Sequence, residues 1–559
     1  MVALLLGPVL RHVGEHDATI WVETVAPCEV EVRAGDVAGR SPTFAVGGHH
    51  YAVVVLTGLP AASSTPYEVR IDDAQVWPME QSPFPASRIR TLDTSRPIRL
   101  LFGSCREAPR RGQDTGERVD VLEAFATRML SQDHQAWPEL LVFAGDQVYA
   151  DDTTPNMRKF ISSRRDIRRP PKAEVADFEE YTRLYLESWG VPKIRWLLST
   201  MPTSMIFDDH DVHDDWNTSH AWRVDMQKEP WWDARITGAL MSYWIYQHLG
   251  NLSPAGLEAD RTYRAVREVA DAEELLREFA RAADREADGA KGAMWSYRRD
   301  FGPVRLLVID SRCGRILADD RRSMISDGEF DWIERQATDG PVEHLVVVTS
   351  MPWLLPRALH DIESWNEALC AGSRGRLLGR AAEWVRRAVD LEHWAAFRLS
   401  FDRLTALFER VGRGEHGEKP PATICVLSGD VHHSYVSEAD YPRPLASRVF
   451  QITCSPLENT IPLAMRGVFH IGWSKHVARF VRLLGRLTRV PPLPIYWHHP
   501  LGPLFGNMLS LLTFDGGSAH VHFEGSAAPD RRARREQPGA KADLEVLGEV
   551  RLTEPRATP

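Results

Sequence analysis

Cysteine is scarce in this chain, and the sequence has neither a long apolar run nor an excess of positive charge. The six cysteines among 559 residues show no CxxC spacing, which argues against a disulfide framework and a structural zinc site. No stretch reaches the roughly 18 apolar residues of a transmembrane helix, so we expect no membrane span. The formal net charge of −10 argues against sequence-specific nucleic-acid binding.

The beginning of the chain lacks the features of a secretory leader. Met1–Leu10 contains no basic residue, its apolar run is short, and strand-like sequence follows at once. We therefore expect no leader and a cytoplasmic location. With 43% hydrophobic and 26% charged residues, the composition is that of an ordinary globular protein with room for two or three domains.

One segment, Met205–Trp216, concentrates charge to an unusual degree. It follows the apolar run Thr203–Phe207, which predicts a short buried strand. Within it lie Asp208, Asp209, His210, Asp211, His213, Asp214 and Asp215. Carboxylates this crowded repel one another unless cations neutralise them, and oxygen ligands beside imidazoles suit divalent or trivalent metals. The simpler alternative is a charged surface turn that caps the next helix.

Three further segments repeat the pattern of an apolar strand, a glycine and then polar side chains. They are Ile98–Cys105, Leu140–Asp152 and Thr423–His433, which carry Cys105, Asp146 with Tyr149, and Asp430 with His432 and His433. Open α/β sheets hold their sites at the carboxyl ends of their strands. Four such strand ends together predict one site.

The ordered motifs resemble a known family. They are Gly-Ser-Cys105, Gly-Asp146-x-x-Tyr149, Asp208-Asp209-His210-Asp211, Asp310-Ser-Arg312 and Gly-Asp430-x-His432. In this order, over roughly residues 98 to 525, they resemble the PhoD-like branch of the metallophosphoesterases. The resemblance implies an α/β fold with a metallophosphoesterase-like β-sandwich flanked by helices. It also implies hydrolysis of a small phosphate ester, either a monoester or a diester.

The resemblance also implies a metal centre that contains Fe³⁺ and Ca²⁺. The implied ligands are Cys105, Asp146, Tyr149, Asp209, Asp430 and His432, with Asp146 placed to be shared between ions. A thiolate with a phenolate suits a hard trivalent ion better than Mg²⁺, although another divalent metal stays an alternative. For Cys105 and Tyr149 the simpler alternatives are a buried structural thiol and a core phenol.

Two residues are candidates for roles other than metal binding. His210 stands where the wider superfamily has a histidine near the leaving-group oxygen, which implies a general-acid role. Its alternative is a histidine that merely orients a carboxylate. Arg312 is a candidate for holding a phosphate oxygen, with a surface ion pair as its alternative. The sequence departs from the family where Asp214 and Asp215 replace two frequent asparagines, which adds negative charge and leaves metal identity open.

Sequence patterns divide the chain into three parts. Alternating apolar residues over 1–95 predict a small all-β domain, immunoglobulin- or fibronectin-like. The catalytic domain is predicted over 98–525, with helical insertions at about 153–196, 255–290 and 355–410. Residues 526–559, which are rich in arginine and proline, predict a loosely ordered tail.

Two questions stay open at this level. Residues 475–489 form a basic amphipathic segment, typical either of an ordinary surface helix or of a helix in weak contact with an anionic membrane. The leading function is phosphate-ester hydrolysis. The alternatives are metal-dependent hydrolysis of another ester or anhydride, and a non-catalytic metal-binding protein whose β domain docks a partner.

Overall fold

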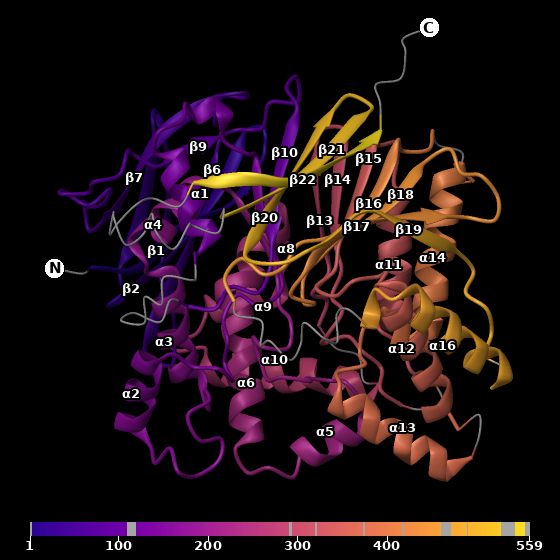
Figure 1. Ribbon diagram of the computed structural model, residues 1–559. Helices are drawn as coiled ribbons and strands as arrows, with labels where there is room; N and C mark the ends of the chain where they lie inside the picture. The colour runs from indigo at the N-terminus through magenta and orange to yellow at the C-terminus, as the bar shows by residue number, and fades with distance from the viewer. Residues whose placement is uncertain are drawn as a thin grey trace, which may run out of the picture.

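The computed structural model describes most of the chain. It covers residues 3–108, 119–289, 293–318, 321–372, 375–415, 419–459, 471–488, 490–526 and 543–553. Figure 1 shows an N-terminal β region beside a larger body in which helices surround two sheets. None of the helices in these ranges is both long and apolar enough to cross a membrane.

The N-terminal region is all-β and consists of two sheets. The first has the order β1 (Leu4–Val13), β2 (Asp17–Thr24), β6 (His49–Thr57) and β5 (Phe44–Val46); the second has the order β4 (Val37–Pro42), β3 (Glu29–Ala34), β7 (Ser64–Ile71) and β8 (Ala74–Trp77), with β9 (Arg88–Arg90) paired to β7. Ile20 and Val54 from the first sheet share a buried core with Val32 and Val69 from the second. The predicted all-β region is confirmed, and its immunoglobulin- or fibronectin-like topology stays a prediction.

The body is built on two larger sheets. One has the order β12 (Thr203–Ile206), β11 (Leu140–Ala144), β10 (Ile98–Gly103), β20 (Met508–Asp515), β21 (Ser518–Ser526) and β22 (Leu544–Thr553); the other has the order β13 (Tyr297–Phe301), β14 (Val304–Val308), β15 (His344–Val348), β16 (Thr423–Ser428), β18 (Arg448–Thr453), β17 (Ser434–Asp440) and β19 (Tyr496–Leu504). Strands β10, β11 and β12 are parallel, as are β14, β15, β16 and β18. All the strands that were predicted to end in polar residues are among these parallel ones.

Strand periodicity explains how the second sheet is covered on both faces. Val346 and Val348 of β15 belong to the same buried core as Leu100 of the first sheet. The intervening Val347 points to the opposite face, where it packs in a core with Phe408. The two sheets therefore form a sandwich with helices outside, and the predicted mixed α/β architecture is confirmed.

Helices fill the connections between the strands. Those before β13 are α1 (Val121–Met129), α2 (Pro155–Arg164), α3 (Phe178–Trp189), α4 (Pro192–Thr200), α5 (His220–Met226), α6 (Trp232–Ser242), α7 (Leu249–Asn251), α8 (Pro254–Ala259), α9 (Arg261–Val266) and α10 (Glu273–Asp284); those after β14 are α11 (Asp327–Ala337), α12 (Arg357–Cys370), α13 (Arg376–Ala388), α14 (Arg398–Arg413) and α16 (Lys475–Leu487). Helices α2 to α4, α8 to α10 and α12 to α14 lie in the segments predicted as helical insertions.

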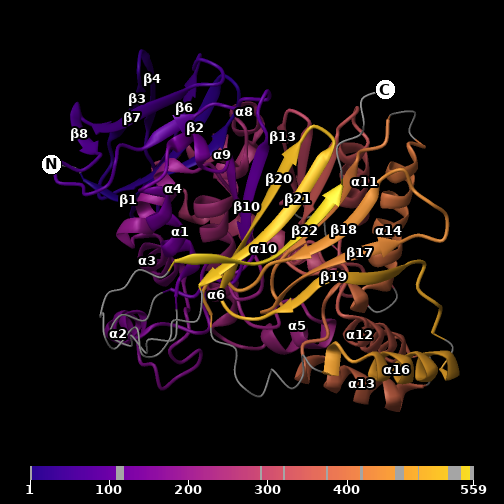
Figure 2. The ribbon, with the colours of Figure 1, turned by 45° about the horizontal axis from the view of Figure 1, so that its top comes forward.

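The prediction of a loosely ordered tail over 526–559 is wrong for Leu544–Thr553. This segment is β22, which pairs antiparallel with β21 and buries Leu552 (Figure 2). The hydrogen bonds between β21 and β22 are made by main-chain groups, so an edge of β21 that would otherwise be unpaired can accept almost any extended segment. The charged residues around Leu544–Thr553 therefore concealed the strand from a prediction based on side chains. Residues 527–542 and 554–559 lie outside the described part of the chain.

Candidate metal centre

The carboxyl ends of the parallel strands from the two sheets meet at one place. A side chain on Gly429, after β16, would place its Cβ 2.0 Å from the Ser104 hydroxyl oxygen and 2.8 Å from the Ala144 carbonyl oxygen. Gly145, after β11, has φ +102°, and a Cβ there would lie 2.8 Å from the Cβ of Asp208. Only glycine permits this approach, which brings the polar residues of both sheets together.

Four of the predicted ligands have left-handed backbone conformations. The φ angles are 55° at Cys105, 53° at Asp146, 65° at Asp430 and 49° at His432. Such conformations cost on the order of 1 kcal/mol or more per residue and persist where the surroundings enforce them. Strain that recurs at three strand ends of one site is typical of a functional centre, where the direction of the side chains matters more than a low conformational energy of the backbone.

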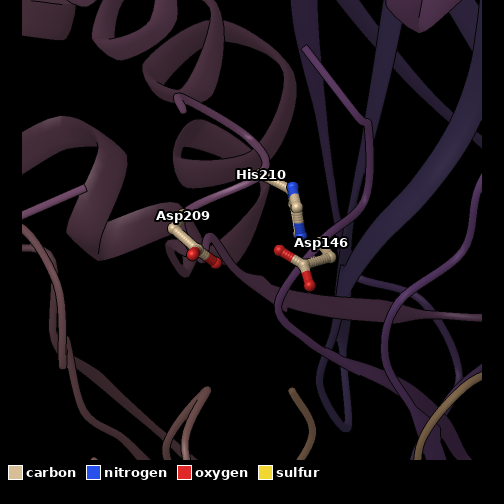
Figure 3. A group of neighbouring side chains, drawn as sticks. All are labelled: Asp146, Asp209 and His210. Carbon is tan, nitrogen blue, oxygen red and sulfur yellow. The ribbon is translucent and has the colours of Figure 1, made fainter. Parts of the chain in front are cut away.

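Two groups of side chains converge closely enough to hold a metal ion. Ligand atoms of Asp146, Asp209 and His210 all lie within 4.8 Å of one another, and so do those of Asp208, Asp209 and Asp430. Figure 3 shows Asp146, Asp209 and His210 pointing toward a common space. Asp209 belongs to both groups and is therefore placed between the two candidate ion positions.

Some oxygen atoms of this cluster lack the partners that a buried carboxylate needs. Among the described residues, Asp146 Oδ1 and Asp208 Oδ2 are buried without a hydrogen-bond donor. Burial, followed by the neighbouring Cys105, raises the pKa of Asp146 well above its usual range. Burial also raises the pKa of Asp208 to about 8, although Arg312 opposes the rise. Buried carboxylates with open oxygens fit bound cations, which would supply the missing positive charge.

Cys105 and Tyr149 approach this cluster from one side. The Cys105 sulfur lies 3.2 Å from Asp146 Oδ2 and 3.1 Å from the Ser455 hydroxyl oxygen. Burial, followed by Asp430, raises the pKa of the Cys105 thiol to about 12, so a bound cation is what would make a thiolate here. The Tyr149 hydroxyl oxygen accepts a 2.9 Å hydrogen bond from Asn459, which holds the phenol in place.

His210 is held by a carboxylate that the sequence did not single out. Its Nδ1 lies 2.9 Å from Asp151 Oδ2, and its ring stacks on Tyr149 with centroids 4.5 Å apart. The same Asp151 oxygen accepts the backbone N–H of Asp214 at 2.7 Å. Burial works to lower the pKa of His210, but the carboxylates of Asp151, Asp209 and Asp146 together outweigh it, and the pKa rises well above its usual range.

Asp430 also has an unforeseen partner. His393 Nε2 lies 2.7 Å from Asp430 Oδ2, and His393 Nδ1 lies 2.7 Å from Glu363 Oε1. The histidine therefore links the candidate ligand to a second buried carboxylate. His393 and Glu363 lie in the segment 355–410 and belong to no motif, so the sequence offered no signal beyond the expectation of a helical insertion there.

Arg312 is buried among carboxylates rather than exposed. Its guanidinium contacts Asp208, lies 3.1 Å from Asp209 Oδ1 and lies 2.6 Å from Glu392 Oε2. The alternative of a surface ion pair is wrong, because the side chain is fully buried. These contacts favour an electrostatic role, in which Arg312 fixes two aspartates of the centre. Its predicted contact with substrate stays a prediction.

The two neighbouring histidines after β16 differ in their surroundings. Burial, followed by the charge of His210, lowers the pKa of His432 to about 4. His433 has Nδ1 2.7 Å from the Val431 carbonyl oxygen and Nε2 3.3 Å from the Trp473 indole nitrogen. With both ring nitrogens of His433 engaged, the geometry favours His432 as the histidine that serves the centre.

Asp211 organises the loops beneath the site. Its carboxylate accepts backbone N–H groups from Asp146 at 3.1 Å, from Asp208 at 2.9 Å and from Val148 at 3.3 Å. These bonds tie the loop after β11 to the loop after β12. Asp211 therefore holds the polar strand ends together, although it belongs to neither converging group.

Comparisons with known proteins agree with this geometry. Residues 120–462, more than half of the chain, match the family described as PhoD-like phosphatase. The chain belongs to this family. Residues 1–89 match a domain of unknown function (DUF7800). No curated protein matches the chain.

Two solved structures resemble the chain at low sequence identity. The structure titled "Structure of PhoD" has a TM-score of 0.58 at 11% identity, covering 98% of this chain and 89% of that one. A purple acid phosphatase, PPD1 from yellow lupin (Lupinus luteus) seeds, has a TM-score of 0.44 at 11% identity, covering 94% of this chain and 72% of that one. Family membership identifies the chain as a phosphoric ester hydrolase and implies a small phosphate-ester substrate, and the acidic groups of the site could bind metal.

Proposed function

We propose that this PhoD-like protein hydrolyses phosphomonoesters or phosphodiesters at a centre that holds Fe³⁺ and Ca²⁺. The observation that supports this most directly is the convergence of two ligand groups on Asp209. Two cations held side by side neutralise a phosphate and activate water for attack on phosphorus. The Cys105 thiol contacts Asp146 and the Tyr149 ring stacks on His210, which makes the Asp146, Asp209 and His210 group the candidate iron position.

The ligands of the second group suit an ion that binds oxygen. Asp208, Asp209 and Asp430 supply only carboxylate oxygens, the ligands that Ca²⁺ prefers. His432 is assigned to the same centre on its position after β16. Asp209, which belongs to both groups, is suited to join the two ion positions, and Asp146, expected from the sequence to be the shared ligand, converges with it in the group beside Cys105. The identity of the second ion rests on this donor set, and another divalent metal is the alternative.

The protein's own side chains perform the proton transfer in this proposal. Asp151 holds His210 through Nδ1, which leaves Nε2 to donate a proton to the leaving-group oxygen. The buried Arg312 keeps Asp208 and Asp209 aligned while charge develops on the phosphate. A non-catalytic metal-binding protein would need the carboxylates but not the paired His210 and Asp151.

Elemental analysis and a substrate screen test the proposal together. Protein produced with ample iron and calcium should contain both metals. It should release p-nitrophenol from p-nitrophenyl phosphate or from bis(p-nitrophenyl) phosphate. An active protein that contains zinc alone would exclude the iron assignment but would leave the assignment as a hydrolase intact. A fully metallated protein inactive on monoesters, diesters and anhydrides would favour the non-catalytic alternative. If both substrates are hydrolysed, their kcat/KM values show whether the enzyme prefers monoesters or diesters.

A further inference from the structure

Helix α16 carries its large apolar side chains on the outside of the molecule. Phe480, Leu483 and Leu487 have exposed fractions of 61%, 53% and 66%, whereas the small Ala478 and the Val481 side chain face inward. The alternative raised by the sequence was an ordinary surface helix that packs its apolar face. Here the helix packs through its small residues, and its largest apolar groups stand in contact with water.

Helix α13 also carries large apolar side chains on its solvent-exposed side. Leu377 is 82% exposed and Trp384 is 72% exposed. The two are seven residues apart and so lie on one face of the helix. Leu378, Val385 and the following Val389 are exposed as well. A tryptophan with almost three quarters of its surface open to water is unusual in a protein whose other large aromatic side chains are mostly buried.

Helix α12 joins the two helices. Trp365 donates its indole N–H to the Thr488 hydroxyl oxygen at 3.0 Å, at the end of α16. One residue further, Asn366 donates to the Ala382 carbonyl oxygen of α13 at 2.9 Å. Figures 1 and 2 both show α12, α13 and α16 grouped at one end of the molecule. We call the exposed residues of these two helices the α13–α16 face.

The charges on this face are of one sign, in a protein whose net charge is −10. Helix α16 exposes Lys475, Arg479, Arg482 and Arg486 and contains no acidic residue, and α13 exposes Arg376 and Arg380 and, in part, Arg387, whereas its Arg386 is buried. The single acid of α13, Glu383, is engaged with the Ser219 hydroxyl and, at 3.2 Å, with Arg386. Apolar side chains are therefore ringed by basic ones, which is the composition of helices that lie in a membrane interface.

We propose that the α13–α16 face docks this protein onto an anionic lipid bilayer. Trp384, Leu377, Phe480 and Leu483 insert among the headgroups, and the surrounding arginines contact lipid phosphates. Charge complementarity selects this occupant, because a second copy of the chain would bring another basic face against the first. The proposal concerns where the protein sits and does not depend on the reaction that it catalyses.

Vesicle flotation tests the proposal. The full chain is mixed with vesicles of phosphatidylcholine alone or with about 30% phosphatidylglycerol, at low and at raised salt. We expect flotation with the anionic vesicles only, and less of it at raised salt. Leu377→Ser with Trp384→Ser, or Phe480→Ser with Leu483→Ser, should lower the partition coefficient about tenfold or more.

Charge reversal and a matched control locate the contact. Arg479→Glu with Arg486→Glu should weaken binding about fivefold for each residue. The control is Val269→Ser with Val25→Ser, which removes two exposed apolar side chains elsewhere and should leave flotation unchanged. All variants should keep the wild-type unfolding midpoint and activity on a soluble substrate, since the altered side chains stand in water.

Three results would overturn the proposal. The first is a wild-type protein that fails to float with anionic vesicles, and the second is equal flotation of wild type and the serine variants. The third is a concentration-dependent dimer, seen by light scattering, that the Leu377→Ser and Trp384→Ser changes dissolve. That last result would assign the face to a second copy of the chain.

Discussion

His210 Nδ1 lies 2.9 Å from Asp151 Oδ2. This pair fixes the imidazole ring on a loop that follows β12, while Asp151 itself lies on the loop that follows β11. The carboxylate fixes the tautomer, because a ring that donates from Nδ1 leaves Nε2 for the substrate side. Two strand ends thus combine to orient one candidate proton donor, which no reading of either segment alone would show.

Replacing His210 by alanine should lower kcat by about 10²–10⁴-fold, which is the usual contribution of general acid–base help. The loss should be small for p-nitrophenyl phosphate, whose leaving group hardly needs a proton, and large for an alkyl phosphate. Steady-state rates with both substrates measure this. Equal losses would remove the acid role, and loss of bound metal would make His210 a ligand or the support of one.

Replacing Asp151 by asparagine should mimic His210→Ala in part. The amide keeps the size of the side chain but removes the charge that raises the pKa of His210. We expect a lower kcat with KM and metal content close to wild type. Arg168→Gln, at an exposed arginine paired with Asp166, serves as a control for a lost surface ion pair and should leave kcat unchanged. A wild-type rate in Asp151→Asn would exclude the positioning role.

Removing the Asp146 carboxylate should abolish activity together with bound metal. Asp146→Ala deletes a side chain that contacts Cys105 and converges with Asp209 and His210, so the ion position beside Cys105 loses a donor. Elemental analysis of the variant, compared with wild type after chelation and after metal return, measures the effect. Full metal content with full activity in Asp146→Ala would exclude Asp146 from the centre.

Visible absorption should report the Cys105 and Tyr149 side of the centre. Protein loaded with iron should be coloured by charge transfer from thiolate or phenolate, and Tyr149→Phe or Cys105→Ser should each shift or weaken the band. The hydroxyl of Cys105→Ser keeps a donor of similar shape in the same buried place. A band that neither change affects would mean that these two side chains do not bind the metal.

Stability should fall between about pH 6.5 and pH 9 because of His49. Its ring nitrogens lie 2.9 Å from Glu23 and 2.8 Å from Glu179. Burial works to lower the pKa of His49, but the two carboxylates raise it to about 9. A histidine with a raised folded-state pKa stabilises the fold fully below its unfolded pKa of roughly 6.5 and loses that contribution as pH rises through the folded value.

Urea unfolding at several pH values measures this contribution. We expect the wild type to lose roughly 1–2 kcal/mol across the window, because the partly open site screens the charges. His49→Gln should be less stable at low pH and should show a flatter profile. His134→Gln, at a half-exposed histidine beside the exposed Asp133, is a matched control and should retain the wild-type slope. An unchanged slope in His49→Gln would contradict the assignment.

The sequence predicted the strands of the site well, for a clear reason. Runs such as Leu140–Ala144 and 424–427 are wholly apolar, as is typical of parallel strands whose two faces are both covered. The polar residues that follow are equally conspicuous, since a charged cluster after a buried strand has few structural uses. By contrast β22 was missed, because an edge strand gains its stability from main-chain bonds and carries ordinary surface residues.

Sequence alone determined which residue types stand at the strand ends, because apolar runs and glycines are local features that need no partner to be recognised. Only the tertiary structure decided their partners: His210 with Asp151, Asp430 with His393, and the buried Arg312 with Glu392. Each pair joins segments dozens of residues apart. Such contacts depend on how the two sheets and their connecting loops pack. They produce no repeating pattern in the sequence, so they could not be predicted from it.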